Sequence, residues 1–236
     1  MIKKPVFHLR KKKQELPFRD KNFYFLLAAL LVLMIVQPVI SDLYGERNLL
    51  FGYITFSMTL LLSIVSISQV RKWRATGVSL AVLGAIFSWL AFSLDNQLML
   101  YLFLIVDLLF LVLVTSLALQ QIFFSESITI HNVVGALCVY ILLGLIWAIA
   151  YYLVNLVMPG SFNGNLSANL HMQIYGFFYF SFVTLTTLGY GDILPQTATA
   201  RTLVYMEAIL GQFYMATLVA GLVAVHLSNK IGDRDE

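Results

Sequence analysis

Apolar residues gather along this chain in long blocks that are separated by short polar stretches. Six blocks are long enough to cross a bilayer as a helix, which takes about 20 apolar residues. They cover residues 23–41, 49–70, 76–94, 98–119, 133–158 and 202–228. A seventh block, residues 172–186, is too short to span and leads into a glycine-rich stretch. The pattern therefore predicts an all-α membrane protein with a re-entrant helix before its last span.

Composition agrees with this prediction. The chain has 236 residues, of which 60% are hydrophobic and only 11% are charged, whereas soluble domains carry about 25% charged residues. The single cysteine, Cys138, lies inside an apolar block and cannot form an intrachain disulfide. We see no catalytic triad, metal-binding cluster, phosphate-binding loop or nucleic-acid motif, so an enzyme is not expected.

Basic residues are distributed unevenly and predict the orientation in the membrane. Lys and Arg crowd residues 1–22 and recur at residues 71–74, but none lies between Arg74 and Arg201. Cytoplasmic loops carry an excess of Lys and Arg, so both termini and the linker 122–132 are expected on the cytoplasmic side of the cell membrane. The loop 159–173 then faces outside. The basic N-terminus is expected to lie on anionic lipid headgroups.

The stretch from Thr184 to Asp192 reads TLTTLGYGD and has a composition unusual for membrane-buried backbone. Two glycines flank Tyr190 where no helix can continue, so carbonyl groups lose their local donors. In lipid each such group costs several kcal/mol unless something satisfies it. Four copies around one axis would surround a file of cations with these carbonyls. Alternating glycines permit the alternating backbone conformations that point successive carbonyls the same way.

These residues resemble the TVGYG selectivity filter of potassium channels, in a layout similar to the prokaryotic six-helix members. Leu188 stands where valine is usual, and Gly211 falls at the spacing of the inner-helix glycine. The resemblance covers about residues 133–229, while the first ~125 residues share only the layout. It implies a homotetramer that binds K⁺ through the filter, Thr187, Leu188, Gly189, Tyr190 and Gly191, with K⁺ held by the first four. It also implies supporting roles for Thr184, Thr186, Asp192, Tyr179 and Phe180, the last two packing against Tyr190.

The last apolar block is expected to line the pore. Helical spacing puts Gln212, Met215, Val219 and Val223 on one face, where apolar rings close a pore by dewetting. Gly211 would allow either bending at a hinge or close helix packing.

Two acids interrupt the apolar blocks. Asp107 is the one ionisable residue of the fourth block, which lacks the basic residues of a voltage sensor, so strong voltage gating is not expected. Asp107 could be a gating element or could make a structural hydrogen bond. Glu207 is expected behind the filter, bonded to a filter or pore-helix hydroxyl, and a gating role stays open for it as well.

The sequence thus predicts five regions: a basic segment 1–22, a four-helix domain 23–121, a linker 122–132, a pore domain 133–228 and a short tail 229–236 without a ligand-binding module. The expected function is passive, potassium-selective conduction. One alternative is a subunit of a potassium transporter, although those proteins carry four filter-like repeats in one chain. The other is a non-conducting regulatory subunit of another channel.

Overall fold

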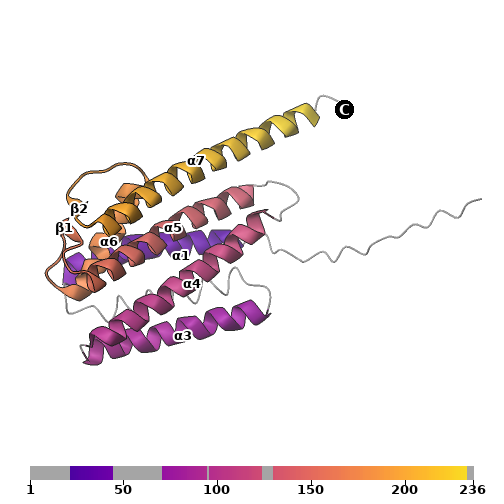
Figure 1. Cartoon of the computed structure of the whole chain (residues 1–236). Helices are drawn as coiled ribbons and strands as arrows, with labels where there is room; N and C mark the ends of the chain where they lie inside the picture. Colours follow the sequence, from indigo (N-terminus) through magenta and orange to yellow (C-terminus); the bar gives the residue numbers. More distant parts are fainter. Residues whose placement is uncertain (1–21, 45–70, 95, 124–129, 233–236) are drawn as a thin grey trace, which may run out of the picture.

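The structure, a computed structural model, describes residues 22–44, 71–94, 96–123 and 130–232. Long helices account for most of these residues (Figure 1). Their bounds are α1 (Asn22–Tyr44), α3 (Arg71–Leu94), α4 (Gln97–Phe123), α5 (Ile130–Val157), α6 (Gln173–Leu185) and α7 (Ala198–Gly232). The span predicted at residues 49–70, the basic segment 1–21 and most of the predicted linker lie outside the described residues.

Four of these helices, α3, α4, α5 and α7, are long and apolar enough to cross a membrane, judged by length and composition. The short α6 is also apolar but has only 13 residues. The predicted class, an α-helical membrane protein, is therefore confirmed. The helix bounds agree with the predicted blocks to within four or five residues at each end that is described.

Helix α7 starts four residues before the predicted block. The helix begins at Ala198, because the Thr197 hydroxyl accepts a hydrogen bond from the Ala200 N–H at 3.2 Å. A threonine in this position satisfies one of the free donors of a helix start. Thr199 and Arg201 of the first turn are exposed and polar, so the apolar pattern begins only after the helix does.

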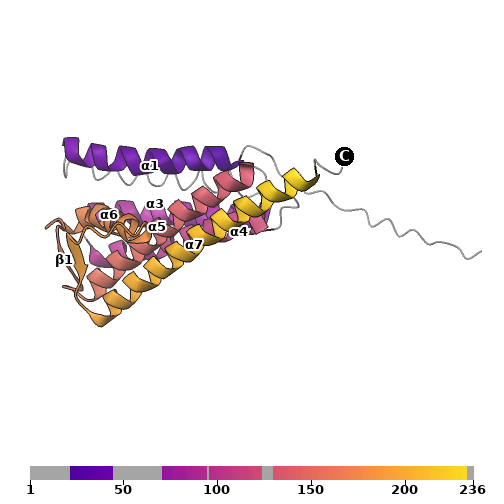
Figure 2. The same ribbon diagram turned by 90° about the horizontal axis from the view of Figure 1, so that it is seen from above.

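The helices pack in a chain of neighbours: α3 on α4, α4 on α5, and α5 on α6. Helix α1 packs on α5 and forms a separate layer along it (Figure 2). There the Phe23 ring centroid lies 5.0 Å from that of His131, and the Cys138 thiol donates to the Phe23 carbonyl at 3.5 Å. The predicted four-helix domain stays a prediction, because its second helix is outside the described residues.

Two short strands were not predicted. Strand β1 (Phe162–Gly164) pairs antiparallel with β2 (Ile193–Pro195), with Gly164 opposite Ile193. The sequence indicated only a turn-rich loop, since strands of three residues are too short to show an alternating pattern. The pairing joins the segment after the glycine-rich stretch to the loop that precedes α6 (Figure 1). A single 3-10 turn, η2 (Leu170–Met172), then leads into α6.

An aromatic cluster holds this end of the fold together. Phe162 of β1 lies with its ring centroid 5.4 Å from that of Tyr151, 5.2 Å from that of Phe177 and 5.6 Å from that of Phe180. All four side chains are buried. Edge-on aromatic pairs at these separations are favourable beyond their burial. The cluster therefore fixes α5, β1 and α6 relative to one another.

Candidate functional site

The stretch after α6 is held by its amide groups. The N–H groups of four successive residues donate back to carbonyls of the last turns of α6. Thr186 donates to Phe182 at 3.0 Å, Thr187 to Thr184 at 2.9 Å, and both Leu188 and Gly189 to Val183 at 2.9 and 3.2 Å. These bonds anchor the stretch to α6, and they use the N–H groups of residues 186–189 as donors.

The backbone of the same stretch alternates in conformation. Thr187, Gly189 and Gly191 have positive φ values of 60°, 60° and 79°, while the residues between them do not. Positive φ is uncommon for a residue with a side chain, so Thr187 is held there by its surroundings. Within the described part of the chain, no donor is recorded for the carbonyls of residues 187–191. The stretch therefore presents a row of available carbonyl oxygens.

This row is exposed in a single protomer. All residues from 186 to 192 are exposed, and Leu188 and Tyr190 have 56% and 68% of their residue surface accessible. Unpaired carbonyls and large apolar side chains on one exposed segment fit a surface that meets other protomers and ions.

Tyr190 was expected to pack against Tyr179 and Phe180, and the structure shows the contact with Tyr179. Its ring stacks on that of Tyr179 in α6, with centroids 6.5 Å apart and planes inclined by 7°. The Tyr179 hydroxyl also contacts the Asp192 carboxylate, and the Asp192 carbonyl accepts from the Asn165 N–H at 3.0 Å. Tyr179 thus braces both sides of Gly191.

The expected packing of Phe180 against Tyr190 needs correction. Phe180 is buried on the opposite side, between Tyr151 of α5 and Phe162 of β1. Successive residues of a helix are about 100° apart around its axis, so Tyr179 and Phe180 cannot both face Tyr190. Phe180 instead anchors α6 to α5.

The two threonines before the filter stretch are held differently. Thr184 contributes its carbonyl, which accepts from the Thr187 N–H. The Thr186 hydroxyl donates to the Phe182 carbonyl at 2.6 Å and closes the end of α6. Both residues therefore help to shape the turn from helix to extended backbone.

Two adjacent residues of α7, Gly211 and Gln212, lie against the end of α6 and the start of the filter stretch. The Gln212 amide donates to the Thr187 hydroxyl at 3.4 Å, so the residue predicted to line the pore lies at the inner end of the filter stretch. A side chain at Gly211 would approach the Leu185 carbonyl to 2.7 Å, closer than real Cβ atoms come. Close packing is thus one reason for this glycine. Helix α7 continues through it, and the predicted hinge stays a prediction.

Glu207 is fully buried where α5, α6 and α7 meet. Its carboxyl group accepts from the Tyr151 hydroxyl, and its other oxygen lies 2.5 Å from the Ser181 hydroxyl. The expected pore-helix hydroxyl partner is therefore Ser181. This hydroxyl also lies 2.7 Å from the Gly144 carbonyl.

The hydrogens of this cluster can be counted. Three oxygen–oxygen contacts need three hydrogens, and the hydroxyls of Tyr151 and Ser181 supply two. The third hydrogen is supplied if Glu207 is a neutral carboxylic acid. Glu207 then donates to the Ser181 hydroxyl, which in turn donates to the Gly144 carbonyl. In that form all three helices are joined without a buried charge.

Asp107 has a different environment. Its side chain is 2% exposed, and its Oδ1 atom has no hydrogen-bond partner among the described residues. The same atom faces Gly84 of α3, 3.4 Å from the position a Cβ would take there. The described chain therefore supplies no hydrogen bond to Oδ1 of the kind that one interpretation of Asp107 required, and both interpretations remain open.

The predicted gate residues lie on an exposed part of α7. Met215, Val219 and Val223 have 39%, 52% and 53% of their surface accessible. Neighbouring apolar residues such as Phe213, at 68%, are exposed as well. Exposure in one protomer therefore does not separate a pore-lining face from a subunit contact, and the gate stays a prediction.

Two tyrosines that the sequence analysis did not single out tie α5 to the site. The Tyr140 hydroxyl donates to the Leu185 carbonyl at 3.1 Å, and the Tyr214 hydroxyl donates to the Ala136 carbonyl at 2.6 Å. Their rings stack with centroids 5.9 Å apart. A buried tyrosine usually finds a partner for its hydroxyl, so their positions within apolar blocks were the available signal.

Comparisons with known proteins agree with this location of the site. Residues 139–226 match the family model described as "Ion channel". The chain is also similar to "Two-pore potassium channel 4" of Arabidopsis thaliana, with 42% identity over 60 residues. That alignment covers 24% of this chain and 21% of the relative, so the chain matches about a fifth of the relative's length. The region from α5 to α7 therefore contains an ion-channel domain, in a multi-pass membrane protein.

Proposed function

We propose that this chain forms a homotetrameric, potassium-selective channel that conducts K⁺ passively. Each protomer would contribute one filter, with K⁺ bound by the carbonyls of Thr187, Leu188, Gly189 and Tyr190 and by the Thr187 hydroxyl. Carbonyl oxygens replace the hydration shell of the ion as it passes. The ion in turn satisfies acceptors that lack donors within the described protomer.

One observation carries this proposal. Positive φ alternates along Thr187, Gly189 and Gly191, while the N–H groups of residues 186–189 are bound to α6 or to the turn that ends it. Over residues 186–189 this arrangement uses the donors and leaves carbonyl acceptors available on an exposed backbone. The ion-channel match at residues 139–226 and the potassium channel named among the relatives support the same conclusion.

The proposal extends to orientation and gating. The distribution of Lys and Arg supports cytoplasmic termini, which places the Asp192 end of the filter outside the cell. Helix α4 has no Lys or Arg between Gln97 and Phe123, which supports weak voltage dependence. The basic segment at the N-terminus would lie on anionic headgroups.

Ion flux through the purified protein in liposomes tests the proposal. K⁺ and Rb⁺ should enter far faster than Na⁺, and Ba²⁺ should block the flux. Equal permeation of Na⁺ and K⁺ would reject the selective filter. The absence of flux from a stable tetramer, at several voltages and pH values, would favour the non-conducting regulatory subunit. Saturable uptake that is not blocked by Ba²⁺ would favour the transporter subunit.

A further inference from the structure

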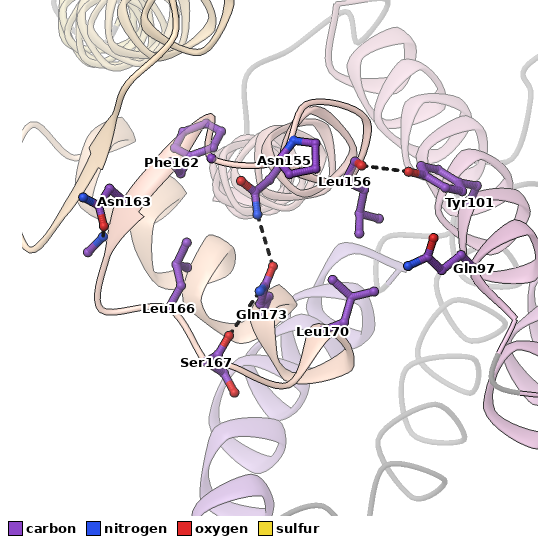
Figure 3. Close-up of a pocket in the computed structure, with 13 residues that line it drawn as sticks. Gln97, Tyr101, Asn155, Leu156, Phe162, Asn163, Leu166, Ser167, Leu170 and Gln173 are labelled. Atoms are coloured by element: carbon purple, nitrogen blue, oxygen red, sulfur yellow. Dashed lines mark hydrogen bonds between the residues drawn. The ribbon is translucent and has the colours of Figure 1, made fainter.

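A cavity of about 370 Å³ lies where α4 begins, α5 ends and α6 begins (Figure 3). Its walls come from α4 (Gln97, Tyr101), the end of α5, strand β1 and the loop that leads to α6. The volume is within the range of small-molecule sites, which begins at about 300 Å³. The residues from Thr184 to Asp192 do not line it, so it is separate from the proposed filter.

Two amide side chains cross this cavity in a fixed order. Gln173, the first residue of α6, donates through Nε2 to the Ser167 carbonyl at 3.1 Å. Its Oε1 must therefore face Asn155, which donates to it through Nδ2 at 3.1 Å. Figure 3 shows the two amides facing each other, with Leu166 on one side and Leu156 and Leu170 on the other.

This order leaves one acceptor without a donor. The Oδ1 atom of Asn155 is buried and has no hydrogen-bond partner among the described residues. Flipping the Asn155 amide would set two oxygens against each other, so the donor at Ser167 fixes the result. A buried acceptor that lacks a partner in a polar cavity indicates a bound group that supplies a hydrogen.

The lining also restricts what that group can be. No Asp, Glu, Lys, Arg or His side chain is among the thirteen described residues that line the cavity. A charged ligand would lose hydration there without a counter-charge from these described residues. The Tyr101 hydroxyl is already used, because it donates to the Leu156 carbonyl at 2.8 Å. The exposed amides of Gln97 and Asn163 lie at the rim and can both donate and accept.

We propose that this cavity binds a small, uncharged molecule with several hydroxyl or amide groups, one of which donates a hydrogen bond to Asn155 Oδ1. The molecule would contact α4 and the first residue of α6 together. It would thereby connect the helices before the pore domain to the helix that carries the filter. The cavity lies beside β1, at the Asp192 end of the filter; that this end faces outside rests on the proposed function, but the binding itself does not.

Saturation-transfer NMR on the purified protein in detergent tests the site without requiring conduction. Glycerol, glucose and urea serve as three uncharged probes, and at least one should give a saturable signal. The N155L variant should weaken that binding by about tenfold, the usual effect of losing one buried hydrogen bond. Gln196, an exposed amide outside the cavity, provides the matched control Q196L, which should bind like the wild type.

Because Asn155 also bonds to Gln173, a second variant protects the test against misfolding. Gln97 is exposed at the rim, so Q97A should fold normally and weaken binding severalfold. Equal binding by the wild type and N155L, when N155L is folded, would overturn the site. No saturable signal from any probe, which is the result expected of a cavity that holds water only, would overturn it too.

Discussion

Glu207 and Asp107 are both acids buried among apolar helices, yet their surroundings differ. Glu207 joins three helices through Tyr151 and Ser181, and the hydrogens of its cluster can all be accounted for. Asp107, between α3 and α4, has an oxygen without a partner in the described chain. The buried polar side chains directly behind the filter stretch are thus closely paired. The filter stretch itself presents backbone carbonyls without recorded donors, and this is where the ion chemistry is expected.

In the proposed function, the backbone around Gly189 carries selectivity and the cluster at Glu207 supports it. Helix α4, which carries Asp107, has neither role in that proposal.

Replacing Gly189 with L-alanine should abolish potassium selectivity. The backbone there has φ of 60°, which costs an L-residue about 1–2 kcal/mol in each protomer of the proposed tetramer. No neighbouring atom lies within 4 Å of the added Cβ in one protomer, so the conformation and not a clash within the chain is responsible. The ratio of K⁺ to Na⁺ flux in liposomes measures the effect.

D-alanine at the same position is the matched control, since it adds the same methyl group but favours positive φ. It should preserve selective flux in a protein assembled by chemical ligation. If both stereoisomers behave alike, the alternating backbone is not what selects the ion.

The second prediction concerns Glu207. E207A leaves the buried Tyr151 hydroxyl without its partner and the Ser181 hydroxyl with only the Gly144 carbonyl, and it should destabilise the protein by about 2–5 kcal/mol. E207Q should be nearly neutral, because its amide can accept from Tyr151 and donate to Ser181, which is the same pattern as a neutral acid. Thermal unfolding in detergent measures the difference. An E207Q protein as unstable as E207A would mean that Glu207 is ionised in the fold.

Much of this division could be predicted from the sequence, because it depends on long and local patterns. Blocks of apolar residues located the described helices to within a turn or so, and the TLGYG run located the filter stretch. Burial of Glu207 against a pore-helix hydroxyl also followed from its place in an apolar block. These signals need no knowledge of distant contacts.

The rest depends on contacts between distant segments. Phe180 was expected to pack against Tyr190, but it packs against Phe162 of β1 and Tyr151 of α5 instead. The β1–β2 pair joins residues about 30 positions apart, and strands of this length leave no pattern. The chain of amides from Asn155 to Ser167 was equally invisible, because it forms only when α5 and α6 pack together.

The third prediction tests whether the gate is separate from the paired cluster. Val219 and Val223 are exposed on α7 and are proposed to form apolar rings at the inner narrowing. V223N should hydrate that level and raise basal K⁺ flux several-fold, because small changes in polarity reverse dewetting. The apolar control V223L should not raise it. An unchanged flux in V223N, in a channel shown to be mostly closed, would place the gate elsewhere, most simply at the filter.

The smallest effect is expected at Asp107, and it completes the comparison. D107N keeps the shape of the side chain but removes its acidity, in a place where the described chain supplies no partner for Oδ1. Stability should therefore change by less than about 1 kcal/mol. The K⁺ to Na⁺ ratio should not change at all, because the filter backbone is held by α6 and not by α4. Open probability, measured in bilayers over a span of about 200 mV, should keep its shallow dependence on voltage. A large shift in open probability with unchanged selectivity would show that Asp107 is the gating element and that the helices before the pore regulate it. A change in selectivity would be the more damaging result, since it would mean that the two regions are not divided as proposed.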